Sequence, residues 1–211
     1  MQVTLSQYRA SKGYVKMSKK IAILRGHPDP AQNHFCDAII EHYKHGAEEA
    51  GHVVQVVDVA SLDFSILRTS EEWTSGTVAP GLEEAQDTFF WADHIVLVYP
   101  LWLGTMPALF KAFLEQVLRA KLNSDGEGNP VAWRKLMQGT SARIIITMGM
   151  PALFYRVFYR SHGLKVLSRN ILSTIGVGPV RSTLFGLIEN VSQAKRMKWL
   201  DKVQKLGMAA K

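Results

Sequence analysis

The strongest constraint on the fold lies between residues 95 and 119. An apolar, β-branched run at residues 95–99 is typical of a strand buried on both faces of a parallel sheet. The run ends in a loop bracketed by Pro100 and Pro107, and a helical pattern follows over residues 108–119. Because ligands of open parallel sheets bind beyond the carboxyl ends of the strands, this loop is a candidate binding site, although a structural connection without a ligand is the alternative.

The alternation of strand and helix continues through the rest of the chain. We expect strands at residues 21–24, 53–57, 95–99, 142–147 and 180–185. We expect helices at residues 35–50, 82–91, 108–119, 153–174 and 191–206, with a long loop at 58–80 and a polar turn at 123–130. Right-handed crossovers place such helices on both faces of the sheet. The sequence therefore predicts a single α/β domain, a doubly wound sheet of five parallel strands.

Length and composition fit one domain of this kind. The chain has 211 residues, of which 47% are hydrophobic and 20% charged. Residues 1–17 are polar and without periodicity, and we expect them to form a tail outside a domain of residues 18–211. The single cysteine, Cys36, excludes a disulfide within the chain and indicates a reducing compartment. With no run of membrane-spanning length and no signal-peptide pattern, we expect a cytoplasmic location.

The charge of the chain is basic but dispersed. Lysine and arginine number 25 against 18 acidic residues, a net charge of +7. No nucleic-acid-binding motif accompanies them, so we expect a solvated basic face or attraction for anionic nucleotide cofactors, and no nucleic-acid partner. The histidines lack metal-ligand spacing, so no metal site is predicted. Cys36 begins a predicted helix, where a structural thiol is the favoured role.

A second candidate site follows the first predicted strand. Residues 26–36 form a loop that runs into the amino end of a helix, where unpaired amides and the helix dipole favour a phosphate group. Neither a P-loop nor the Gly-x-Gly-x-x-Gly fingerprint occurs here. Nucleotide triphosphate hydrolysis and a dinucleotide Rossmann site are therefore disfavoured.

These loops resemble those of the NAD(P)H:quinone oxidoreductases, the flavodoxin-like quinone reductases. In that family the backbone of the loop matching residues 96–111 binds the polar edge of the flavin ring, which implies that the flavin contacts Pro100, Leu101, Trp102, Leu103 and Gly104. The family's phosphate loop carries a histidine and a phenylalanine that match His27 and Phe35. Asn33 and His34 stand where the family has hydroxyl side chains, so backbone contacts are expected there instead.

The resemblance extends to the segment after the fourth predicted strand. Thr147 and Gly149 match a family segment that approaches the pyrimidine end of the flavin, while Met148 and Met150 do not. The family's tyrosine and histidine that neutralise charge on the reduced flavin correspond to Tyr155 and, with a spacing one residue longer, His162. On the residues alone, Tyr155 is equally an interface aromatic, His162 a residue at a helix end, and His27 a loop histidine with a satisfied hydrogen bond.

The resemblance implies a flavodoxin-like fold and a flavin-dependent NAD(P)H dehydrogenase (quinone). Such an enzyme reduces quinones or similar electrophiles by ping-pong hydride transfer through N5 of the flavin. Residues 62–66 are similar to a loop near the adenine of FAD in longer members, which favours FAD over FMN. The aromatic and basic residues 154–159 predict a homodimer with shared active sites.

Two other functions remain open from the sequence. Close relatives of these enzymes serve as ancillary subunits of membrane potassium-efflux systems, so the chain is alternatively a flavin-binding regulator with a peripheral membrane partner. An electron carrier of the flavodoxin type is the third candidate, but such carriers are typically acidic.

Overall fold

One parallel sheet organises the protein. The computed structural model describes residues 18–31, 33–75, 77–124 and 129–211. Within them the strands lie in the order β2-β1-β3-β4-β5, and all neighbours pair in parallel. The strands are β1 (Lys20–Arg25), β2 (Val53–Asp58), β3 (His94–Pro100), β4 (Ser141–Met148) and β5 (Val180–Gly186). The predicted fold class is thereby confirmed; the predicted tail, residues 1–17, lies outside the described residues.

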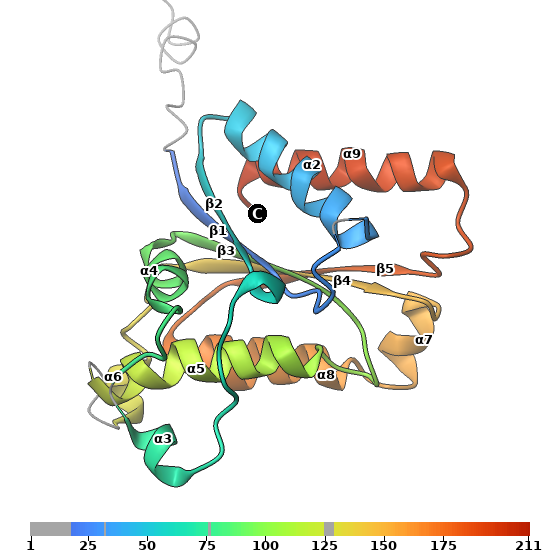
Figure 1. Cartoon of the computed structure of the whole chain (residues 1–211). Coiled ribbons are helices and arrows are strands. Elements are labelled where there is room, and N and C mark those ends of the chain that lie inside the picture. Colours follow the sequence, from blue (N-terminus) through green and yellow to red (C-terminus); the bar gives the residue numbers. More distant parts are fainter. Residues whose placement is uncertain (1–17, 32, 76, 125–128) are drawn as a thin grey trace, which may run out of the picture.

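Helices cover both faces of this sheet (Figure 1). On one face lie α2 (Phe35–Glu49) and α9 (Gln193–Ala209). On the other lie α4 (Glu83–Trp91), α5 (Ala108–Ser124) and α8 (His162–Lys165). Three further short helices lie at the periphery: α3 (Ser70–Thr74), α6 (Pro130–Trp133) and α7 (Ala152–Val157). The long loop predicted at 58–80 contains α3 and a 3-10 turn at Val59–Ser61.

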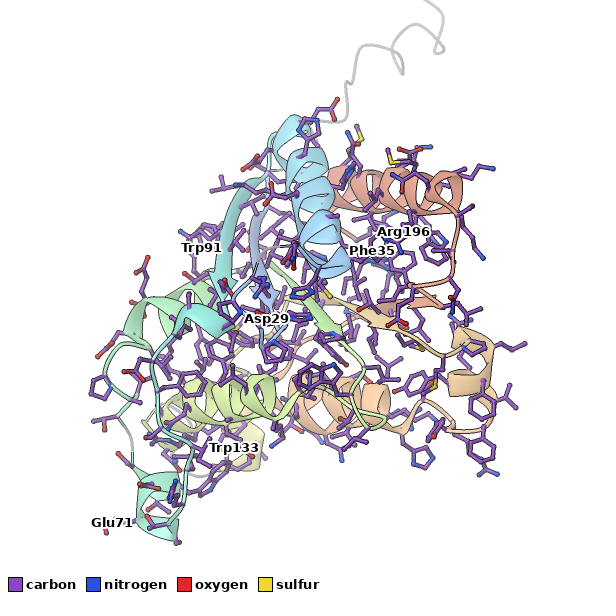
Figure 2. All side chains as sticks on the ribbon, turned by 45° about the vertical axis from the view of Figure 1, so that its right-hand side comes forward. Asp29, Phe35, Glu71, Trp91, Trp133 and Arg196 are labelled. Atoms are coloured by element: carbon purple, nitrogen blue, oxygen red, sulfur yellow. The ribbon has the colours of Figure 1, made fainter. Side chains whose placement is uncertain are left out.

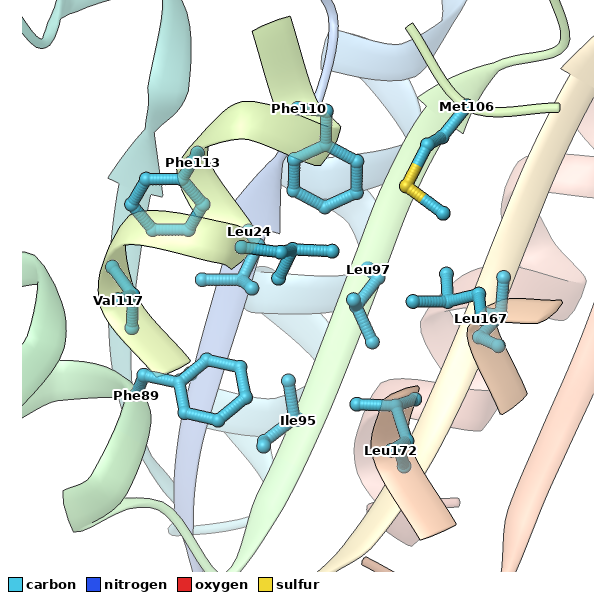
Figure 3. Close-up of a cluster of buried hydrophobic side chains, with 14 of the residues drawn as sticks. Leu24, Phe89, Ile95, Leu97, Met106, Phe110, Phe113, Val117, Leu167 and Leu172 are labelled. Carbon is cyan, nitrogen blue, oxygen red and sulfur yellow. The ribbon is translucent and has the colours of Figure 1, made fainter. Parts of the chain in front are cut away.

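The core is divided between the two faces of the sheet. Every residue of β3 is buried, as its continuous apolar run predicts. Alternate residues point to opposite faces: Leu24 and Leu97 pack beneath α5, whereas Ile23 and Val96 pack beneath α2. Figure 3 shows the first of these clusters, where aromatic side chains of α4 and α5 meet the sheet.

Two glycines bring α2 and α9 into close contact. A Cβ atom on Gly46 would lie 2.1 Å from the carbonyl oxygen of Gln204, and one on Gly207 would lie 2.1 Å from that of Tyr43. Each helix therefore approaches the other at a point where any side chain would collide with backbone. The absence of side chains at Gly46 and Gly207 therefore allows α2 and α9 to pack this closely.

The prediction of one helix over residues 153–174 is wrong. The chain forms α7, turns, and continues through α8, a π-helix at Val166–Leu172 and a 3-10 turn at Ser173–Ile175. At the turn, Arg160 and Ser161 have φ angles of 48° and 52°, which interrupt a right-handed helix. The break lies two residues before Gly163, whose contact with the turn after β3 is described below.

Candidate functional site

The candidate site lies at the carboxyl edge of the sheet. Since all strands are parallel, the loops after β1, β3 and β4 emerge at the same edge (Figure 1). The chain passes from β1 to β2 on one side and returns to β3 on the other side of β1. The edge between β1 and β3 is therefore the topological switch point, where doubly wound sheets bind their ligands.

The loop after β3 is a tight turn. The amide of Trp102 donates to the carbonyl of Thr105 at 2.9 Å, and the amide of Thr105 donates to the carbonyl of Trp102 at 3.0 Å. Leu103 and Gly104, at the tip, have φ angles of 46° and 82°. The Leu103 side chain is fully exposed. Among the described residues, the amides of Leu103 and Gly104 have no hydrogen-bond acceptor, so both are free to bind a ligand.

Tyr155 and α8 hold this turn from behind. The Tyr155 side chain is buried; its hydroxyl accepts the amide of Leu164 at 3.0 Å and donates to the carbonyl of Gly104 at 3.5 Å. A Cβ on Gly163 would lie 2.3 Å from that carbonyl oxygen, so α8 touches the turn at a glycine. This contact accounts for the break between α7 and α8. Sequence reasoning missed Gly163, although a glycine inside a predicted helix signals a close approach.

These contacts bear on the two predicted catalytic residues. The Tyr155 hydroxyl is bonded to the backbone of the turn and of α8, so its placement favours support of the turn over contact with a ligand. His162 is exposed and lines a depression together with Leu103 and Tyr159. The structure thus brings His162 beside the tip of the turn and places Tyr155 beneath it. The catalytic roles of both stay predictions.

The loop after β4 joins the other two. The carbonyl of Thr147 accepts the amide of Leu101 at 2.8 Å, beside Pro100, which pairs with Thr147 in the sheet. The buried Thr147 hydroxyl lies 3.3 Å from Sγ of Cys36 in α2, and burial raises the pKa of this thiol to about 11. Cys36 is therefore a neutral, structural thiol, as predicted. A Cβ on Gly149 would meet no atom within 4 Å, so a flat ligand has room to approach its backbone.

The loop after β1 presents two stacked histidines. The ring centroids of His27 and His34 lie 3.8 Å apart with the planes nearly parallel, and the Trp102 ring stands edge-on to His27 with 6.3 Å between the ring centroids. His34 Nε2 contacts a carboxylate oxygen of Asp29 at 3.0 Å. Burial, and then the neighbouring His34, lower the pKa of His27, whose Nδ1 accepts the amide of Asp29. The neutral ring of His27 therefore carries its proton on Nε2, as a donor.

The amino end of α2 completes this part of the site. Asp37 Oδ2 accepts the amide of His34 at 2.8 Å. Phe35 and Cys36 are the first two residues of α2, and amides at these positions have no carbonyl acceptor within the helix. The Phe35 ring packs against Phe185 and Trp199, with Arg196 5.9 Å above it (Figure 2). Asn33 is exposed just before the helix. These are the residues that the sequence assigns to a phosphate.

Sequence reasoning missed one residue beneath this loop. Arg25 ends β1 and is buried, and its guanidinium bonds to the carboxylates of Asp37 and Asp58. An arginine at the end of an apolar strand is a signal that could have pointed to it, because a buried charge requires partners. The described residues contain no cluster of three side chains suited to a metal ion.

Comparison with known proteins identifies the family. The pattern that defines the flavodoxin-like fold matches residues 19–206, which is most of the chain. The chain belongs to the flavodoxin-like fold family. The family resemblance found in the sequence is thereby confirmed.

Individual relatives in this family are oxidoreductases by name. An uncharacterized NAD(P)H oxidoreductase of Haemophilus influenzae is 27% identical over 186 residues, which cover 85% of this chain and 89% of the relative. FMN-dependent NADH:quinone oxidoreductase 1 of Colwellia psychrerythraea is 33% identical over 121 residues, 56% of this chain and 59% of that protein. The structure of NAD(P)H:quinone oxidoreductase from Methanothermobacter marburgensis shares the fold, with a TM-score of 0.73 and 19% sequence identity. The match covers 91% of this chain and 96% of that protein.

The flavodoxin-like fold protein shows no candidate membrane span. Among the residues that the structure describes, no helix combines the length and the apolar character that crossing a bilayer requires.

Proposed function

We propose that this flavodoxin-like fold protein is an FMN-dependent NAD(P)H oxidoreductase that reduces quinones or similar electrophiles. The observation that carries the proposal is the meeting of three loops at the switch point of the sheet. Two free amides at the tip of one loop, open space above Gly149 and a helix amino end lie on these loops. The named activities of the Haemophilus and Colwellia relatives support the same reaction class.

FMN is the cofactor that we propose, in place of the FAD favoured by residues 62–66. The Colwellia relative is named as FMN-dependent. In this chain the segment expected near an adenine packs against α5 instead: the ring centroids of Phe64 and Phe113 lie 6.3 Å apart, and the side chain of Gln116 donates to the carbonyl of Ser65 at 2.7 Å. These contacts give the segment a role in the fold that needs no dinucleotide.

The residues of the site fit the parts of such a cofactor. The free amides of Phe35 and Cys36 at the amino end of α2 suit its phosphate. The amides of Leu103 and Gly104 would donate to carbonyl groups at the polar edge of its ring, and Nε2 of His27 would donate to the phosphate. A bound flavin supplies hydride transfer through N5, with the nicotinamide and the acceptor using the site in turn. The chain itself positions the reactants and excludes water.

A homodimer is the assembly that we propose. Exposed apolar side chains lie next to the turn after β3 and along α7: Leu103, Leu153, Phe154, Val157, Phe158 and Tyr159. Monomeric proteins rarely leave such a patch uncovered. A second copy of the chain would cover it beside the site. We expect light scattering to show a dimer, and Phe158→Glu to shift it toward monomer; a wild-type monomer with full activity at high dilution contradicts the assembly.

Flavin titration tests the proposed function directly. We expect the purified protein to bind FMN at micromolar concentration or tighter, and to oxidise NADH or NADPH when menadione is the acceptor. Gly149→Leu fills the open space above the loop and should weaken FMN binding by roughly tenfold or more. Gly178→Leu is the matched control, since a Cβ there also meets no atom within 4 Å, but Gly178 lies two residues before β5, at the amino edge of the sheet. Failure of the wild type to bind FMN or FAD overturns the proposal.

Turnover also separates the enzyme from its alternatives. An electron carrier would bind flavin without oxidising NAD(P)H at a useful rate. A regulator of potassium efflux would copurify with a membrane partner, and the named relatives do not favour that role. The cytoplasmic location and the lack of a nucleic-acid partner stay predictions from the sequence.

A further inference from the structure

Arg25 is a buried arginine beneath the loop after β1, and all its donors are bonded. It ends β1, and its side chain is only 4% exposed. A guanidinium group has five N–H donors, and here all five are used. Nε donates to Asp37 at 2.6 Å, Nη1 to Asp58 at 3.0 Å and to the carbonyl of His27 at 3.2 Å, and Nη2 to the carbonyls of Asp29 and Ala31, both at 2.9 Å.

The partners of Arg25 define the path of the loop after β1. The three carbonyls belong to alternate residues of that loop, so the chain wraps around one cation. Pro28 and Pro30 restrict the backbone between them. With its carbonyls turned inward, the loop presents the stacked rings of His27 and His34 beside the turn after β3.

Arg25 also fixes the start of α2 through Asp37. One carboxylate oxygen of Asp37 accepts Nε of Arg25, and the other accepts the amide of His34 at 2.8 Å. This carboxylate therefore connects the buried cation to the first residues of the helix. The orientation of the next amides, those of Phe35 and Cys36, depends on this arrangement.

We propose that Arg25 is a positioning residue that holds the loop after β1 and the start of α2 in the shape that binds the phosphate of the flavin. The inference rests on the proposed function, because that function places the phosphate here. Arg25 acts through the loop, since its own donors are all occupied.

The effect of Arg25 should fall on the phosphate rather than on the ring of the cofactor. The turn that faces the ring is held separately by Tyr155 and Gly163. Loss of the guanidinium frees three loop carbonyls and removes the paired bonds that hold the carboxylates of Asp37 and Asp58, so the loop and the start of α2 lose their shape. Riboflavin, which has the same ring but no phosphate, is therefore the appropriate reference ligand.

The test compares FMN with riboflavin in Arg25→Lys. Lysine keeps the charge but has too few donors, and a compact ammonium cannot reproduce the planar fork. We expect the preference for FMN over riboflavin, measured as the ratio of dissociation constants by fluorescence titration, to fall by roughly tenfold or more, as for lost charge-assisted bonds. Riboflavin affinity itself should change little.

Arg143→Lys is the matched control. Arg143 is also a buried arginine on a central strand, bonded to Thr183 at 2.7 Å, but it lies on the opposite half of β4 from the site. It should lower stability without changing the FMN preference. Hydrogen exchange of residues 26–38 in the flavin-free protein provides a second measurement, and we expect faster exchange in Arg25→Lys only.

The outcomes separate the two proposals. A wild type that binds no flavin overturns the proposed function and, with it, the role of Arg25. A wild type that prefers FMN, together with an unchanged preference in a folded Arg25→Lys, overturns the Arg25 inference and leaves the proposed function intact. Equal losses for FMN and riboflavin also overturn it, because they indicate general damage to the fold. If Arg25→Lys does not fold, Asp37→Asn takes its place. Faster hydrogen exchange of residues 26–38 with a reduced preference for FMN supports the inference, and an unchanged preference overturns it.

Discussion

Replacing Tyr155 by phenylalanine distinguishes support of the β3 turn from direct catalysis. The family resemblance predicts that the hydroxyl stabilises charge during hydride transfer. The structure shows the hydroxyl accepting the amide of Leu164 and donating weakly to the carbonyl of Gly104. A supporting role predicts lower stability with a nearly unchanged hydride-transfer rate, whereas a catalytic role predicts a slower rate with unchanged stability.

The magnitude follows from the contacts that are lost. The ring is fully buried and Phe keeps its packing, so the change removes little apolar contact. The amide of Leu164 loses an acceptor at 3.0 Å, and an unsatisfied amide of this kind costs about 1–2 kcal/mol of unfolding free energy. The long bond to Gly104, at 3.5 Å, adds little. We therefore expect a loss of stability of about 1–2 kcal/mol and only a small change in the hydride-transfer rate.

Two measurements on the same variant test this expectation. Urea unfolding gives the stability, and stopped-flow reduction of bound FMN by NADH or NADPH isolates the hydride step from acceptor binding. Tyr159→Phe is the control, since Tyr159 is 41% exposed and, among the described residues, the hydroxyl that bonds to the turn is that of Tyr155. A direct catalytic contact would instead slow reduction by roughly ten- to a thousandfold. Such slowing with unchanged stability would refute the supporting role.

Three further predictions concern stability. Burial lowers the pKa of His94 to about 3 in the folded protein, whereas the unfolded chain takes up this proton near its ordinary value, so below about pH 6.5 the native state should lose about 1.4 kcal/mol per pH unit from this group. Urea unfolding at pH 7.5 and 5.5 should show this dependence, weakened in His94→Gln; an equal dependence in both contradicts it. Gly207→Ala places a Cβ against the carbonyl of Tyr43, and calorimetry should show destabilisation by about 1–3 kcal/mol. Leu103→Asn should raise stability by about 0.5 kcal/mol, because asparagine tolerates the left-handed backbone of the turn better than leucine; a fall in the melting temperature would show that Leu103 is packed.

Periodicity and residue type determined the sheet and most helices of this protein. The buried run of β3 and the strand-helix alternation sufficed because each strand and helix buries an apolar face with its own period. The Pro-bracketed turn after β3 and the loop before α2 were located in the same way. The proposed ligand contacts of these loops are made by backbone amides, whose positions follow from where a strand ends and a helix begins. Those boundaries can be predicted from local sequence.

The tertiary structure decided how these loops are held. Arg25 and Tyr155 form hydrogen bonds with groups that are distant in the sequence: Arg25 with the carboxylate of Asp58, and Tyr155 with the carbonyl of Gly104. The break between α7 and α8 likewise comes from the contact of Gly163 with the turn after β3. Local propensity carries no information about which distant carbonyl a buried donor will meet, because that depends on the packing of the whole sheet. The sequence by itself therefore determined which loops form the candidate site, and the packing determined which side chains shape it.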